Sequence, residues 1–170
     1  NSEFEAWIIV LDRGFRNKHL MHHIYYTLKR MFLVRLSHTQ HVFRRGWKKS
    51  KSIKSFMSDK DAIQLEQGKL WTVQNVQINA WKDTFKTAVT VVIYQGNGFK
   101  NPLVICVSQA EMTQNEAFGF VRMYFRRWKI EQLFKELKSF FCFEKFKVTS
   151  DTAIKKYLHI AILVHTLFTT

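Results

Sequence analysis

Apolar residues in the first forty positions form two short continuous runs that flank an amphipathic stretch. Residues 6–11 are apolar and rich in β-branched side chains, which predicts a strand buried on both faces, as in the middle of an α/β sheet. Residues 17–30 predict a helix that begins with Asn17 as its N-cap. Its buried face would carry Leu20, Ile24, Tyr25 and Leu28. Residues 31–36 form the second run, and a strand, a helix and a strand of these lengths predict a parallel crossover.

The middle of the chain has the pattern of a sheet. Residues 70–78 and 84–94 alternate in part between apolar and polar side chains, which predicts strands with unequal faces. A glycine-containing turn at residues 95–98 separates them from a final apolar strand at residues 102–107. Residues 38–108 are therefore predicted to form a β-rich segment.

A long helix is predicted after this segment. Residues 124–138 contain neither Gly nor Pro and are mostly good helix formers, and the helix should cover residues 115–141. Thr113 and Glu116 have the spacing of a capping box at its start. After a short link, residues 151–167 predict a last helix.

The polar side of the long helix combines side chains of different chemistry. At about 100° per residue, five of them fall within an arc of roughly 80°. These residues are Tyr124, Arg127, Glu131, Lys135 and Lys138. One carboxylate within a stripe of cations and a phenol is the composition expected where a metal ion meets a phosphate chain. The alternative is a solvated polar face on which Glu131 and Lys135 form an ordinary ion pair.

The composition indicates a folded domain with a large excess of positive charge. Apolar residues make up 46% of the 170 positions, and the net charge is +14. Such a surface attracts a polyanion, usually nucleic acid, and the cations are spread along the chain rather than gathered on one membrane-binding segment. No apolar run is long enough to span a bilayer. Cys106 and Cys142 lie far apart in the sequence, which predicts reduced thiols in a cytoplasmic protein.

Residues 41–54 interleave cations with aromatic side chains. Long cations contact phosphates and aromatic rings stack on exposed bases, so Arg44, Arg45 and Trp47 are predicted to contact DNA. The alternative for this segment is a charged loop in solvent. Other polar residues are interpreted as surface residues, namely His19, His22, His23, Asp59 and Asp61.

Asp12 and Arg13 follow the first predicted strand directly. Ligands bind at the carboxyl ends of strands in open α/β sheets, although Asp12-Arg-Gly also suits a plain turn. Phosphodiester cleavage requires carboxylates from different elements that converge on divalent cations, and hard oxygen ligands suit Mg²⁺. Asp12 and Glu131 are the two acids that folding would have to bring together.

Two motifs resemble those of one enzyme family. Tyr124-x2-Arg127-x3-Glu131-x6-Lys138 resembles the signature of the insertion-sequence-four family of DDE transposases. The segment that starts at Asp12, Asp-Arg-Gly-Phe, resembles the surroundings of that family's second catalytic Asp.

The resemblance implies an α/β fold with a ribonuclease H-like core, truncated at its N-terminus, and a β-rich insertion. Residues 1–37 would be the first part of the core, residues 38–108 the insertion, and residues 109–170 the catalytic and C-terminal helices. It also implies a bacterial, DNA-associated enzyme that uses Asp-Asp-Glu with Mg²⁺ or Mn²⁺ to cut transposon ends and join them to target DNA. The full-length protein would be a homodimer.

The resemblance also assigns roles to residues. Asp12 matches the second acid and Glu131 the third, and both would bind the metal. Tyr124, Arg127 and Lys138 match the positions that hold the double-stranded transposon end. Arg13 and Lys135, which lie on or beside the two motifs, are also predicted to contact DNA.

One acid of the trio has no counterpart. The first Asp is expected on an earlier strand, and no sequence precedes Asn1. We therefore expect a fragment that does not catalyse transposition by itself. Two alternatives remain open: a non-catalytic DNA-binding remnant, which explains the charge equally well, and a ribonuclease H-like nuclease. The nuclease shares the acids but gives no reason for the spacing of Tyr124, Arg127 and Lys138.

Overall fold

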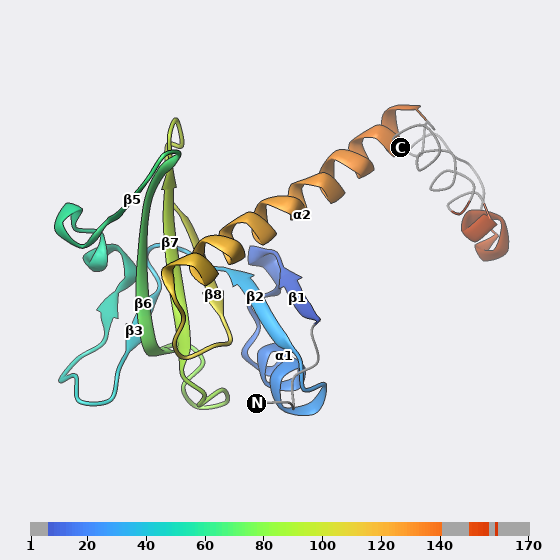
Figure 1. The fold of residues 1–170 in the computed structure, drawn as a ribbon. Coiled ribbons are helices and arrows are strands. Elements are labelled where there is room, and N and C mark those ends of the chain that lie inside the picture. The colour runs from blue at the N-terminus through green and yellow to red at the C-terminus, as the bar shows by residue number, and fades with distance from the viewer. Residues whose placement is uncertain (1–6, 141–149, 157–158, 160–170) are drawn as a thin grey trace. The chain divides into compact units, whose positions relative to one another are not determined.

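The computed structural model describes residues 7–140, 150–156 and 159 (Figure 1). The chain divides into two compact units, Asn1–Tyr124 and Phe125–Thr170. The first unit is a mixed α/β structure that consists mostly of sheet, so the predicted α/β class is confirmed.

In the described part of the first unit, eight strands form one sheet (Figure 1). Its order is β1-β2-β8-β7-β6-β3-β4, and β5 pairs with β6 outside this path. The strands are β1 (Ile8–Leu11), β2 (Met31–Arg35), β3 (His41–Phe43), β4 (Lys51–Ser52), β5 (Ile63–Leu65), β6 (Gly68–Ile78), β7 (Val89–Gly96) and β8 (Leu103–Val107). β1 and β2 pair in parallel, as the predicted crossover requires, whereas the other described pairs are antiparallel.

The prediction that the first strand is buried on both faces is wrong. Among the described residues β1 pairs only with β2, and all four of its residues are half-buried. Phe32, Leu33 and Val34 of β2, one position further into the sheet, are fully buried. The two apolar runs look alike in sequence, but only strand order decides which of them has neighbours on both sides.

The crossover helix is present but changes its winding. An α-helix α1 (Lys18–His22) continues as a π-helix η2 (His23–Thr27), in which the Leu28 amide bonds the carbonyl of His23, five residues back. Asn17 caps α1 as predicted, since its side chain accepts from the His19 amide at 2.9 Å. The placement of Leu28 on the buried face is wrong, because it is 46% exposed. A π-turn rotates later residues away from the face that α-helical spacing predicts.

Residues 38–60 contain more structure than a basic loop. β3 and β4 form a hairpin, which is followed by two short 3₁₀ helices, η3 (Ile53–Phe56) and η4 (Asp59–Asp61). The strand predicted at residues 84–94 begins only at Val89, because residues before it form a turn in which the Phe85 amide bonds the carbonyl of Trp81 at 2.8 Å.

Strands from the predicted core and from the predicted β-rich segment belong to one sheet. β2 pairs directly with β8, with Leu33 opposite Val107. The predicted core therefore continues into the predicted β-rich segment without a break in hydrogen bonding, and the division at residues 37 and 108 stays a prediction.

An aromatic cluster holds the crossover against the sheet. The ring of Phe85, which is 1% exposed, meets Tyr25 at 5.4 Å and Phe32 at 5.5 Å between centroids, both edge to face. Trp81 joins the cluster, and its indole N–H donates to the carbonyl of Arg16 at 3.2 Å. This bond ties the loop that follows β1 to the packed core.

The long helix α2 (Gln114–Phe140) is confirmed, as is its capping box. The Thr113 amide donates to Glu116 Oε2 at 2.7 Å, and the Glu116 amide donates to Thr113 Oγ1 at 3.3 Å. Residues 150–156 give the start of the predicted last helix, with the Ile154 amide bonded to the Ser150 carbonyl. His159 is also helical, whereas the intervening link, Cys142 and the other residues of that predicted helix lie outside the described residues. Within those residues no helix has the length and apolarity to cross a membrane.

Candidate functional site

Asp12 lies at the carboxyl end of β1. Its main-chain carbonyl accepts from the Phe15 amide at 3.0 Å and closes a 3₁₀ turn, η1 (Arg13–Phe15). The side chain makes no capping bond to this turn. The half-buried carboxylate is therefore directed by contacts from elsewhere in the fold, while neighbouring Arg13 is exposed.

One such contact comes from α2. Tyr124 Oη donates to Asp12 Oδ1 at 3.3 Å, across 112 positions of sequence. Tyr124 is only 5% exposed and its hydroxyl faces Asp12, while its predicted contact with DNA stays a prediction. The sequence carried a signal for this burial: Ala117, Val121 and Tyr124 recur at helical spacing, and all three are buried.

Glu131 lies in the second unit and forms an ion pair on its own helix. Its Oε1 lies 2.6 Å from Nη1 of Arg127, one turn earlier. The alternative partner, Lys135, is exposed, and the side chain of Lys138 lies outside what the structure describes. An Arg that precedes Glu by four residues is the less stabilising order on a helix, so this pair contributes little to helix stability.

The predicted DNA-binding residues Arg44, Arg45 and Trp47 lie in the loop between β3 and β4. Arg44 and Arg45 line a pocket of about 490 Å³, together with Asn75 and Gln77 of β6. Asn75 sits at a β-bulge with a φ of 58°, an irregularity that the sequence analysis missed.

The predicted DNA contact of Trp47 stays a prediction, and the structure gives the ring partners within the protein. The half-buried indole stacks on Phe56 with centroids 5.7 Å apart, and two cations, Arg44 and Lys51, lie over it at 5.3 and 4.9 Å. The ring is therefore engaged in contacts within the protein.

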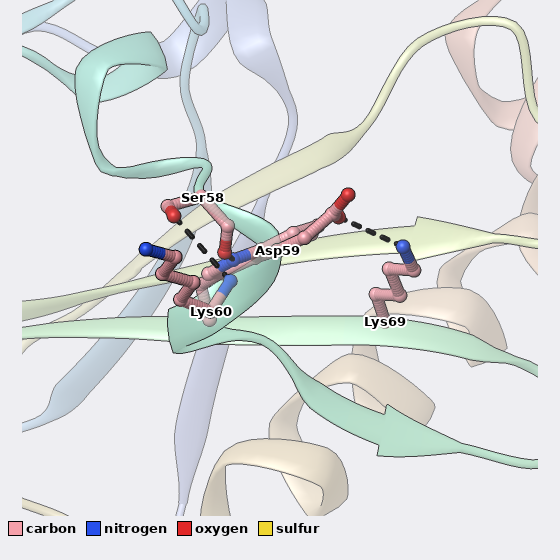
Figure 2. Close-up of polar contacts among 5 residues, drawn as sticks. Ser58, Asp59, Lys60 and Lys69 are labelled. Atoms are coloured by element: carbon pink, nitrogen blue, oxygen red, sulfur yellow. Dashed lines mark hydrogen bonds and ion pairs between the residues drawn. The ribbon is translucent and has the colours of Figure 1, made fainter.

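The other predicted surface residues are confirmed as exposed. Asp59 Oδ1 bonds Lys69 Nζ at 2.8 Å, and Ser58 Oγ accepts from the Lys60 amide at 3.4 Å (Figure 2). Asp59, whose carboxylate already pairs with a cation on the surface, is a poor candidate for a catalytic acid.

As for a metal, the carboxylate of Asp12 is a hard oxygen donor at a half-buried position, which suits Mg²⁺ or Mn²⁺ as one ligand. The described ranges contain no group of three or more His, Cys, Asp or Glu side chains that could hold a metal ion. Asp12 therefore fits the chemistry of such an ion as a single ligand.

Comparison with known proteins identifies the family. No curated protein matches the sequence. The family model described as "Transposase DDE domain" matches residues 6–167, a span that includes Asp12 and all of α2. The chain therefore belongs to the transposase DDE domain family.

Proposed function

We propose that this chain is the part of a DNA transposase, of the insertion-sequence-four type, that carries the second and third catalytic acids. Its family supports a transposase-related polynucleotidyl transferase. The net charge of +14 supports a polyanionic partner, and the family supports DNA, here proposed to be the double-stranded transposon ends and target. The enzyme would act on bacterial DNA in the cytoplasm as a homodimer, on a ribonuclease H-like core with residues 38–108 as its insertion.

Asp12 and Glu131 are the proposed metal ligands. Mg²⁺ or Mn²⁺ bound there would activate the attacking oxygen and stabilise charge on the leaving oxygen. The observation that supports the proposal most is the bond from Tyr124 to Asp12, because it joins the two sequence motifs on which the resemblance rests. Tyr124 would orient the carboxylate of Asp12 before metal and DNA bind.

Arg127 has two roles in this proposal. Glu131 pairs with Arg127 through Oε1 at 2.6 Å and keeps further lone pairs that could bind a cation, and a bound cation would weaken its hold on Arg127. The guanidinium of Arg127 is then able to form a forked pair with a DNA phosphate. Arg13, Lys135 and Lys138 would contact other phosphates of the transposon end.

The test uses the full-length protein and a plasmid that carries its reading frame with the flanking DNA. Asp12→Asn and Glu131→Gln should each abolish Mg²⁺-dependent cleavage yet retain DNA affinity, because each removes a metal ligand and not a phosphate contact. Arg127→Ala should weaken DNA binding and lower the slope of log affinity against log salt by about 0.9. Cleavage that survives both acid variants would refute the assignment.

A non-catalytic DNA-binding protein is the second candidate. It is favoured by the loop between β3 and β4, whose exposed cations require no metal. Salt-sensitive DNA binding by the full-length protein without any Mg²⁺-dependent cleavage would select this candidate.

A further inference from the structure

A hairpin formed by residues 41–52, here called the basic hairpin, concentrates positive charge on the first unit. It consists of β3, β4 and the loop between them. Its Lys and Arg residues are Arg44, Arg45, Lys48, Lys49 and Lys51. No acidic residue occurs between positions 41 and 58, so no acid of this segment itself offsets the charge.

The hairpin is anchored to the sheet. β3 pairs with β6, with Val42 opposite Ile78, and Val42 is fully buried. The guanidinium of Arg44 crosses the same junction and donates from Nη2 to the carbonyl of Gln74 on β6. Arg44 is thereby used inside the protein and is not presented as a phosphate contact.

The tip is closed by a turn. The Trp47 amide donates to the carbonyl of Arg44 at 3.0 Å. Gly46 has a φ of 93°, a backbone conformation that side chains disfavour, so glycine permits the turn at this position. Trp47, which follows this glycine, is partly buried and packs against the hydrophobic core.

Trp47 stabilises the hairpin through three contacts and is here called its brace. Its stacking on Phe56 connects the loop to η3, and its contacts with Arg44 and Lys51 connect the two sides of the hairpin. An indole with these three neighbours is not available as a platform for an unstacked base.

Four cations of the hairpin remain exposed around this brace. They are Arg45, Lys48, Lys49 and Lys51. Cations held on an anchored loop lose less conformational entropy on binding than cations on a mobile one. Such an arrangement suits the regularly spaced phosphates of a duplex better than a flexible single strand.

We propose that the basic hairpin is a preformed clamp for the phosphate backbone of double-stranded DNA, in which Trp47 is an internal brace and not a base-stacking residue. The proposal rests on the proposed function for its ligand, DNA. It adds which surface holds the duplex and how that surface is kept in shape.

The first test measures binding of labelled duplex and single-stranded DNA of one sequence between 50 and 200 mM salt. Lys48→Ala/Lys49→Ala removes two exposed charges of the clamp. The control, Lys155→Ala/Lys156→Ala, removes two adjacent exposed lysines of the second unit. The clamp variant should lower the slope of log duplex affinity against log salt by about 1.8. Between 50 and 200 mM salt, the parent should therefore lose about tenfold more duplex affinity than the variant does. The control should change the slope less.

The second test addresses Trp47, with folding followed by thermal unfolding. Trp47→Leu removes the brace and should reduce duplex affinity by about threefold or more, with a lower salt slope and a smaller loss of affinity for single-stranded DNA. Trp47→Phe keeps a ring against Phe56 and should stay close to the parent. Should Trp47→Leu fail to fold, the lysine pair and Trp47→Phe still decide the matter.

Three results would overturn the proposal. A selective loss of single-strand affinity in Trp47→Leu at unchanged slope would show base stacking. Equal effects of the two lysine pairs would show diffuse attraction with no clamp, while leaving DNA as the ligand. A parent protein without salt-dependent DNA binding would overturn both this proposal and the proposed function.

Discussion

Replacing Tyr124 with phenylalanine removes one hydroxyl and keeps the buried ring. That hydroxyl donates to Asp12 at 3.3 Å, and the residue is 5% exposed. A hydrogen bond to a charged acceptor contributes about 1.5–3 kcal/mol to stability, and a neutral one about 0.5–1.5 kcal/mol. Because 3.3 Å is much longer than the ~2.6 Å of a strong O–H···O⁻ bond, we expect a loss of about 1 kcal/mol.

This loss predicts two measurable effects. The thermal midpoint of unfolding should fall by about 2–4 °C for a chain of this length. In the full-length enzyme, a less well oriented Asp12 should raise the barrier to cleavage by about 1 kcal/mol, which is about fivefold in rate. Duplex affinity should not change, because the phenol donates to a carboxylate inside the protein.

Tyr94→Phe provides the matched control. Tyr94 is 4% exposed, and its hydroxyl donates to the carbonyl of Gln67 at 2.9 Å. Its loss should lower the midpoint to a similar extent and leave the cleavage rate unaltered. Circular dichroism measures the unfolding midpoint, fluorescence anisotropy with labelled duplex measures DNA affinity, and a plasmid assay measures the cleavage rate. If Tyr124→Phe keeps the parent's midpoint but binds duplex more weakly, the phenol contacts DNA and the reasoning from Asp12 fails.

Three further predictions concern the fold. Phe85→Ala should destabilise the first unit by about 3–5 kcal/mol in denaturant unfolding, because it empties the centre of the aromatic cluster. Bonds from the backbone amide and the hydroxyl of Thr113 lower the pKa of Glu116, so this carboxylate stabilises the fold fully above its unfolded pKa and progressively less as pH falls through the folded value. Glu116→Gln should remove that part of the acid unfolding curve, and Thr113→Ala, which keeps the backbone donor, should flatten it only in part. Burial raises the pKa of Tyr25, so stability should fall as pH rises past the ordinary tyrosine value of about 10, and Tyr25→Phe should remove this dependence, in pH-dependent melts.

Local signals in the sequence predicted the local structure well. The parallel crossover follows from two apolar runs and the helix between them, and the Asn17 cap and the Thr113–Glu116 box follow from side chains that reach only their own turn. Such features depend on neighbouring residues alone. The π-turn after His22 escaped prediction because it depends on how the crossover packs onto the sheet.

The aromatic residues show why tertiary contacts were harder to predict. Trp47 lies in a basic segment, and composition alone suggested a ring that faces DNA. Its position was decided by Phe56, nine residues further along, which brings a second ring to stack on it. A composition argument gives the chemistry available in a segment, but it does not give the direction in which each side chain points.

The spacing of the transposase-like motif on α2 is best explained by contacts that Tyr124 and Arg127 make with the two candidate acids. Tyr124 donates to Asp12, and Arg127 pairs with Glu131, so each acid has one motif residue as its neighbour. Helix rules alone favour Lys135 as the partner of Glu131, because Glu followed by Lys is the more stabilising order. The observed pair is with Arg127, and Lys135 is exposed. In the proposed function, Tyr124 and Arg127 would orient the two carboxylates before DNA binds, and the guanidinium of Arg127 would exchange Glu131 for a phosphate when DNA binds.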